Sequence, residues 1–382
     1  MTKTRALRAL AAGVLLCAAM PTAAAQTYSV LHSFTGTDGG DPFAGVIADP
    51  AGNLFGTTLG GEAGTVYKLD QTGLTVLYAF TNASDGVGPV SGLLRDAAGN
   101  LYGTTSSGGH SGEGTIYKVD PSGTETVLYS FKGGKYGWNP IAALIRDTTG
   151  DLYGTTGSGG TANHGTIFKL DKSGQTVLHS FRDKPDGNNP QGTLIQDLPG
   201  NLYGATAYGG ALGFGAVFKL DTTGHLTILY SFTGFGDGSE PMAGLIEDTS
   251  GNFYGTTSLG GTSNAGVVFQ LDAAGMEKAL YSFTGGTDGA NPMAALVRDA
   301  DGNLYGTTFA GGLASAEQCP SGCGVVFKID PAGTETVLYS FTGGADGANP
   351  TAGLLRDTAG NLYGTATRGG ASNNGVVFKI AP

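Results

Sequence analysis

The chain has 382 residues and a formal net charge of −11, with 31 acidic against 20 basic side chains. This acidic balance argues against nucleic acid as a partner, because phosphates bind where basic side chains are in excess. Glycine is abundant, at 69 residues, but the glycines occupy fixed places in a repeat, which excludes collagen-like and low-complexity chains.

The first 25 residues are typical of a secretory signal peptide. Three basic residues near the start are followed by an apolar stretch, 9–20, which is too short to span a membrane. Small residues end the segment at Ala25, as the cleavage rule requires. No later apolar run approaches the roughly 20 residues that cross a bilayer, so we expect no transmembrane segment. We expect a secreted or periplasmic protein after cleavage near Ala25.

From residue 26 onward one unit is repeated seven times. Each copy contains Leu-Tyr-Gly-Thr or a close variant, and its glycine recurs at intervals of 47 to 58 residues. These glycines are Gly56, Gly103, Gly154, Gly204, Gly255, Gly306 and Gly364. A period of this size is typical of a solenoid, a propeller or an array, and it indicates one large repeat domain.

Each unit contains four short runs that favour β-strands. In the sixth copy the runs are 293–299, 303–308, 324–329 and 335–341. Asp-x-x-Gly sequences join the first run to the second and the third to the fourth, and they are good tight turns. No helical period follows residue 26, so an all-β fold of four-stranded antiparallel units is predicted.

Two features favour a closed seven-bladed β-propeller over an extended array. The first run always contains two small or near-small residues, such as Ala294-Ala295, which suits an inner strand crowded around a central axis. Residues 28–34 match a fourth run, whereas the chain ends after a third run, so the N-terminal strand would complete the last blade. The predicted domain is 26–382. Its blades are expected at 42–80, 89–131, 140–181, 190–232, 241–283, 292–341 and 350–382 with 28–34.

The glycine of Leu-Tyr-Gly-Thr lies inside a predicted strand, where glycine usually marks the close approach of another segment. We expect an aromatic side chain of the neighbouring blade, Phe341 or its equivalents, to lie over this glycine. The motif is therefore interpreted as structural.

The sixth copy has an insertion that holds Cys319 and Cys323. In an oxidising compartment a local disulfide is expected. A zinc site is the weaker alternative, because zinc usually takes four ligands and no further Cys or His lies nearby in the sequence.

The repeats resemble the GloVer tandem-repeat family of exported bacterial proteins. The resemblance rests on the sequences at Gly99–Thr105, Val337–Phe341 and Gly375–Lys379, and it covers Tyr28 to Pro382. It implies propeller-like repeats and export, and it brings no established activity and no catalytic residues. Family members often carry a C-terminal sorting anchor, but this sequence ends directly after a repeat strand, so the resemblance implies no anchor here.

Six connections between repeats carry Asp-Gly, and a ring of carboxylates at a channel mouth would suit a divalent cation. The weak candidate metal ligands are Asp186, Asp237, Asp288 and Asp346. Turn formation explains Asp-Gly equally well in every copy, and we favour that explanation. We therefore expect no cofactor, with a divalent cation as the alternative.

Functional residues are expected where the copies differ. The third connection replaces Asp-Gly with a segment containing the single tryptophan of the chain. The candidate ligand-binding residues are His110, Lys135, Tyr136, Trp138, His164, Arg182 and Tyr208. In a propeller they would meet in one sector of one face, where aromatic and cationic groups suit a sugar, peptide or anionic ligand. Drift in exposed loops is the alternative.

We interpret the protein as a binding or interaction module for a glycan or protein at the cell exterior, and we expect a monomer. The first alternative is an extracellular propeller lyase or hydrolase acting on polysaccharide or peptide, for which His110 and His164 are the only acid–base candidates. The second is a structural cell-envelope protein. No nucleophile elbow, zinc-protease motif or phosphate-binding loop occurs, so no catalytic residue is assigned.

Overall fold

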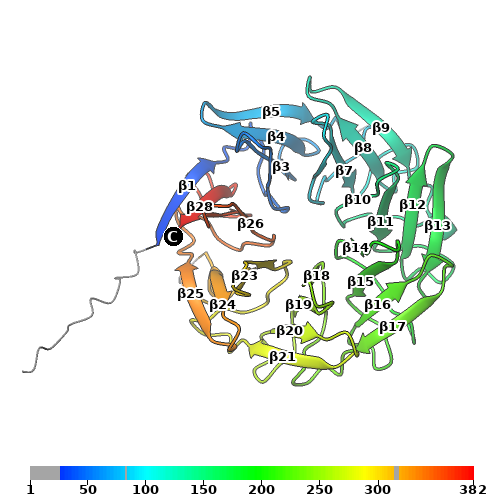
Figure 1. The fold of residues 1–382 in the computed structure, drawn as a ribbon. Helices are drawn as coiled ribbons and strands as arrows, with labels where there is room; N and C mark the ends of the chain where they lie inside the picture. The colour runs from blue at the N-terminus through cyan, green and yellow to red at the C-terminus, as the bar shows by residue number, and fades with distance from the viewer. Residues whose placement is uncertain (1–25, 82–83, 314–317) are drawn as a thin grey trace, which may run out of the picture.

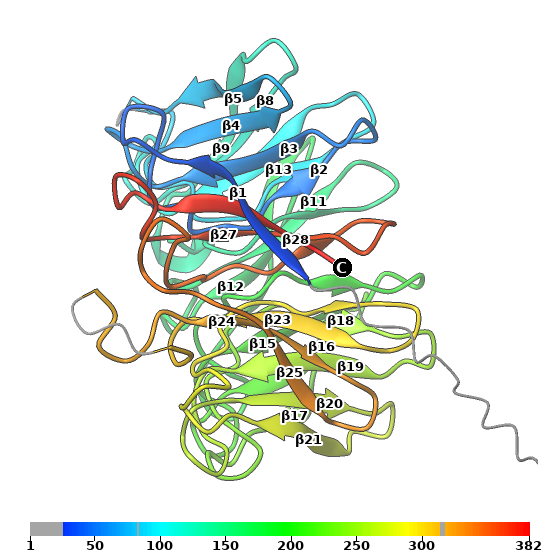
Figure 2. The ribbon, with the colours of Figure 1, turned by 90° about the vertical axis from the view of Figure 1, so that its left-hand side faces the viewer.

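The computed structural model describes residues 26–81, 84–313 and 318–382. The predicted signal peptide lies outside these residues. Seven blades surround a central axis (Figure 1), and the view from the side shows their strands stacked around the ring (Figure 2). The predicted seven-bladed β-propeller of four-stranded antiparallel blades is confirmed.

The strands of each blade follow one another from the axis outward. Blades 1 to 3 contain β2 (Ile47–Ala48), β3 (Leu54–Thr58), β4 (Thr65–Asp70), β5 (Gly73–Ala79); β6 (Leu94–Arg95), β7 (Leu101–Thr105), β8 (Thr115–Val119), β9 (Glu125–Ser130); β10 (Ile145–Arg146), β11 (Leu152–Thr156), β12 (Thr166–Asp171) and β13 (Gly174–Ser180). Blades 4 and 5 contain β14 (Ile195–Gln196), β15 (Leu202–Thr206), β16 (Ala216–Leu220), β17 (Leu226–Ser231); β18 (Ile246–Glu247), β19 (Phe253–Thr257), β20 (Val267–Leu271) and β21 (Glu277–Ser282). Blades 6 and 7 contain β22 (Val297–Arg298), β23 (Leu304–Thr308), β24 (Val325–Ile329), β25 (Glu335–Ser340); β26 (Leu355–Arg356), β27 (Leu362–Ala366), β28 (Val376–Ala381) and β1 (Thr27–Ser33).

The N-terminal strand closes the ring. β1 is the outer strand of blade 7 and pairs antiparallel with β28, from Thr27 opposite Ala381 to Ser33 opposite Val376. The Tyr28 ring stacks on Tyr339 of blade 6, with 3.8 Å between ring centroids. The predicted closure is confirmed: the first strand supplies the outer edge that the last three strands lack.

The innermost strands are shorter than the sequence suggested. The run expected at 293–299 contains only the two-residue strand β22, and its small residues precede the strand. There the seven chains converge on the axis: a Cβ on Gly192 would lie 2.3 Å from the Ala243 carbonyl oxygen of the next blade. Crowding therefore requires small residues, as expected, but it also leaves no space for a longer ladder.

The ring over the strand glycine comes from the same blade. Gly154 pairs with Phe168, and a Cβ on Gly154 would lie 2.8 Å from the tip of that ring. The expectation of a next-blade aromatic was wrong. Residues directly opposite one another in adjacent strands share one face of the sheet, so the third strand already supplies the covering ring.

Phenylalanines that directly follow the outer strands instead join neighbouring blades. Each packs edge to face against an aromatic ring on the third strand of the next blade, with centroids 5.0 to 5.4 Å apart. The seven pairs are Phe34–Tyr67, Phe80–Tyr117, Phe131–Phe168, Phe181–Phe218, Phe232–Phe269, Phe283–Phe327 and Phe341–Phe378. This edge-to-face arrangement is the favoured one for aromatic pairs. One such pair lies at every blade interface and holds the ring together.

Cys319 and Cys323 form the predicted disulfide. Both cysteines are buried in the apolar cluster between blades 6 and 7, which also contains Phe341 and Leu354. Within the described residues, no helix has the length and apolar character needed to cross a membrane.

Candidate functional site

One face of the ring is built from long loops. The connections between blades pair there with the loops that join second to third strands, as in the backbone bridges Trp138–Ser158, Asn188–Tyr208 and Ser239–Leu259. We call this the long-loop face. The short Asp-x-x-Gly turns lie at the opposite ends of the strands.

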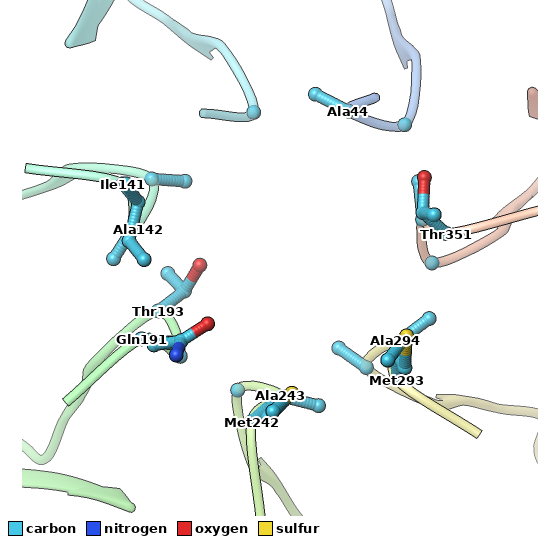
Figure 3. A pocket seen from close by; sticks show the side chains of 18 of the residues that line it. Ala44, Ile141, Ala142, Gln191, Thr193, Met242, Ala243, Met293, Ala294 and Thr351 are labelled. Carbon is cyan, nitrogen blue, oxygen red and sulfur yellow. The ribbon is translucent and has the colours of Figure 1, made fainter. Parts of the chain in front are cut away.

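A cavity of about 280 Å³ lies on the axis. Small residues of the inner segments line it, and the residues that follow the inner prolines also contribute, among them Ile141, Met242 and Thr351 (Figure 3). Among the described residues, those that line it include no carboxylate, imidazole or amine, and neither His110 nor His164 is one of them. Acid–base catalysis needs a titratable group at the reacting atoms, so this cavity does not support the lyase or hydrolase alternative.

The Asp-Gly carboxylates are engaged within their own connections. Asp237 accepts hydrogen bonds from the Tyr230 hydroxyl at 2.9 Å and from the backbone N–H of Thr233 at 2.8 Å. Asp288 and Asp346 make the same contacts. Asp186 lies 3.0 Å from His179 Nε2, because histidine replaces the tyrosine there.

None of these four candidate metal ligands lines the axial cavity. Burial alone would raise the pKa of Asp288, but hydrogen bonds from Thr284 and Tyr281 outweigh burial, and the pKa is lowered. Among the described residues, no three His, Cys, Asp or Glu side chains form a group that could hold a metal ion. A divalent cation stays a prediction.

The connection into blade 3 departs from this pattern. Tyr136 occupies the position of the aspartate, seven residues after Tyr129, and ends a 3₁₀ turn (η1, Gly134–Tyr136). The side chain of Gln175 pairs with both tyrosines: its Nε2 donates to the Tyr136 carbonyl at 3.1 Å, and its Oε1 accepts from the Tyr129 hydroxyl at 3.4 Å. The Tyr136 side chain is left free for other contacts and is 38% exposed.

Two lysines flank the Tyr136 ring. The Nζ atoms of Lys132 and Lys135 lie 5.9 and 5.2 Å from the ring centroid. Both distances are within the range of cation–π attraction.

Trp138 lies two residues further along, half-buried above the loop of blade 3. Its indole N–H donates to Asn163 Oδ1 at 3.3 Å. The next residue, His164, accepts a hydrogen bond at its carbonyl from the Asn189 N–H at 2.9 Å. Trp138 and His164 are thereby connected through one loop to the following connection.

Arg182 and Tyr208 belong to that connection and to the loop of blade 4. Arg182 is tied to Asp186, which its Nε approaches at 3.5 Å. Tyr208 pairs through its backbone with Asn188, and its side chain is 37% exposed. Burial, followed by the charge of Glu240, raises the pKa of Tyr208.

His110 has a different environment. It is exposed in the loop of blade 2, and its backbone N–H donates to Ser130 Oγ of the same blade at 3.3 Å. Among the described residues, no contact joins His110 to another candidate. The structure therefore brings six of the seven candidates onto neighbouring loops. His110 lies on the preceding loop, which is joined to the Trp138 connection by a hydrogen bond from the Asn139 N–H to the Glu113 carbonyl at 3.2 Å.

Two further exposed side chains lie in this region: Phe214, which the sequence also places in this sector beside Tyr208, and Phe235, which the sequence reasoning missed. Phe214 is 41% exposed and covers Gly234, where a Cβ would lie 2.6 Å from its ring. Phe235, which follows Gly234 in the sequence, is 75% exposed. The sequence signal was weak: each phenylalanine replaces a small or polar residue found in the other copies.

Four overlapping segments match the model of the Gloeobacter/Verrucomicrobia repeat: residues 19–196, 62–249, 126–318 and 200–382. Together they extend over all seven blades. The chain belongs to the Gloeobacter/Verrucomicrobia repeat family. The predicted resemblance is confirmed.

Solved structures similar to this Gloeobacter/Verrucomicrobia repeat protein include enzymes. Virginiamycin B lyase from Staphylococcus aureus is 12% identical, with a TM-score of 0.60, and the match covers 94% of this chain and 99% of the lyase. The PQQ-bound aldose sugar dehydrogenase from Streptomyces coelicolor is 14% identical, with a TM-score of 0.50 and coverage of 79% and 96%. A search of curated proteins found no significant match. At these identities the likeness shows the fold alone.

Proposed function

We propose that this repeat protein is an exported binding module whose ligand contacts one sector of the long-loop face. The observation that carries the proposal is the position of its exposed aromatic rings. Among the described residues, five aromatic side chains are 37% exposed or more: Phe43, Tyr136, Tyr208, Phe214 and Phe235. Four of the five belong to loops of blades 3 to 5, and clustered exposed aromatics are typical of binding surfaces.

These rings lie on consecutive, mutually bonded loops. We call Tyr136, Trp138, Tyr208, Phe214 and Phe235 the aromatic band. Trp138 bonds to the blade 3 loop, and that loop bonds to the next connection. This connection pairs with Tyr208, and the carbonyl of Phe214 accepts from the connection that carries Phe235.

The scaffold beneath the aromatic band suits a binding role. Tyr–Asp hydrogen bonds hold the loop ends in the regular copies, so single side chains at the loop tips can change without loss of the fold. A disulfide fits an oxidising compartment outside the cytoplasm. These observations support a glycan or protein ligand at the cell exterior. We propose that the protein binds it as a monomer.

A binding screen on a glycan array and on cell-envelope proteins tests the proposal. We expect Tyr136→Ala and Trp138→Ala to weaken binding about tenfold or more, because truncating a central aromatic commonly costs over 1.4 kcal/mol. Phe43→Ala is the matched control, since Phe43 is exposed on the same face but at the axial cavity. Binding that survives both band variants and disappears in Phe43→Ala would place the ligand at the axis and refute the proposal.

A further inference from the structure

We propose that the ligand of the aromatic band is an acidic polysaccharide, whose carboxylate or sulfate groups pair with Lys132, Lys135 and Lys184. This inference rests on the proposed function and adds the ligand class. It starts from the distribution of charge on the long-loop face.

Basic residues are concentrated beside the aromatic band. The seven connections between blades contain only four basic residues: Lys132, Lys135, Arg182 and Lys184. All four lie in two successive connections, 131–144 and 181–194, in a chain whose net charge is −11. The other five connections carry only acidic charges, and connection 181–194 also contains Asp183 and Asp186. Basic side chains gathered in an acidic protein create a local attraction for anions.

Three of the four cations are available to a ligand. Arg182 is paired with Asp186. Lys132, Lys135 and Lys184 have no ion-pair partner among the described residues. Lys184 extends to the blade 4 loop, where a Cβ on Gly213 would lie 3.7 Å from its Nζ. Its ammonium group therefore lies next to the segment that carries Phe214.

The lysines and the aromatic rings combine two kinds of contact. An aromatic face packs against the apolar C–H face of a sugar ring, and an adjacent ammonium group forms a charge-assisted hydrogen bond with a carboxylate or sulfate. Lys132 and Lys135 each place an ammonium group within 6 Å of the Tyr136 ring centroid, so the two kinds of contact lie close together there. Lys184 repeats the combination near Phe214 at the other end of the aromatic band.

The shape of the surface favours a polymer. No residue of the aromatic band lines the axial cavity, whereas compact small molecules usually bind in concave pockets. A peptide ligand that added a strand would bind along the outer strand edges rather than on these loops. An extended chain with repeated charges and apolar ring faces matches loops that extend over three connections.

Direct binding measurements test the inference. The probes are polygalacturonate, alginate and chondroitin sulfate at 50 mM salt, with carboxyl-reduced polygalacturonate as the neutral counterpart. We expect at least one acidic polymer to bind about tenfold or more tightly than its neutral form, and 0.5 M salt to weaken that binding through screening. The variant Lys132→Gln/Lys135→Gln/Lys184→Gln should bind the acidic polymer about tenfold or more weakly than the parent. Lys278→Gln removes the charge of an exposed lysine on the outer strand β21, away from the long-loop face; it is the control for a remote positive charge and should not change binding.

The outcomes separate the two proposals. Binding that is lost in Trp138→Ala but kept in the triple lysine variant refutes the acidic polysaccharide and leaves the proposed binding site. Equal affinity for poly-L-glutamate indicates an acidic peptide or charge alone, and it also overturns the inference. Failure of all three acidic polymers at 50 mM salt overturns the inference, while the wider glycan and protein screen decides the proposed function independently.

Discussion

Three glutamates predict an unusual pH dependence of stability. Glu125, Glu277 and Glu335 begin the outer strands β9, β21 and β25, and the Oε1 atom of each is buried without a hydrogen-bond partner. Burial, together with the charge of a neighbouring aspartate in the preceding connection, raises the pKa of each carboxyl to about 7. The folded protein therefore favours the neutral form of these three groups.

The direction in which stability changes with pH follows from the coupling between proton binding and folding. Because the folded pKa exceeds the unfolded value of about 4.5, the folded state binds more protons between these limits, and stability falls as pH rises through about 7. A shift of this size corresponds at most to about 3 kcal/mol per glutamate. Each group is only partly buried, so solvent screening reduces the effect, and we expect about 1 kcal/mol for each.

Replacement by glutamine tests this reasoning. Gln175 occupies the equivalent position in blade 3, where both atoms of its amide have partners. At pH 8 we expect Glu125→Gln/Glu277→Gln/Glu335→Gln to be about 3 kcal/mol more stable than the parent and to unfold at a higher temperature. The triple variant should also lose most of the dependence of stability on pH between pH 5 and 8. The exposed Glu62→Gln is the control. Parallel pH profiles of the parent and the triple variant would refute the argument.

Four further substitutions test the fold by thermal unfolding. Glu247→Arg should stabilise the folded protein by about 1 kcal/mol. At the equivalent position four other blades place an arginine over an aromatic ring, as Arg298 lies over Tyr254. Glu247 itself is unfavourable there, because burial and the charges of Asp197 and Asp248 raise its pKa. Tyr67→Phe and Tyr117→Phe should each stabilise the folded protein by about 1 kcal/mol, since both hydroxyls are buried without a hydrogen-bond partner. The other five blades have phenylalanine at this position. A loss of stability in either variant would contradict this reasoning. Gly306→Ala should destabilise by about 2 kcal/mol, since its Cβ would lie 2.6 Å from the Phe327 ring, whereas Gly236→Ala, with open space around it, should be neutral.

The ring could be predicted from the sequence because the information is periodic. Seven copies of four β-favouring runs specify the blades, and the match of residues 28–34 to a fourth run specifies the closure that β1 and β28 form. Turn residues and alternating strands are encoded within about 50 residues. The disulfide could also be predicted from local sequence, since its two cysteines lie only four positions apart.

The packing around the axis and within each blade could not be predicted in this way. The length of β22 and the ring that covers Gly154 depend on how closely strands approach after the blades assemble. The sequence identifies small residues and aromatic rings as partners in close contact. It does not specify which of several equivalent rings meets a given glycine, because every blade supplies the same residue types.

The candidate site likewise contains residues that the sequence identifies and contacts that only the packed structure creates. Trp138 and Tyr136 were visible as departures from the repeat, because comparing copies needs no coordinates. The contact of Phe214 with Gly234, and the burial of Glu125 beside the preceding connection, arise only when the blades pack side by side. Those residues are about 20 to 50 positions apart, and the rotation of each blade about the axis brings them together.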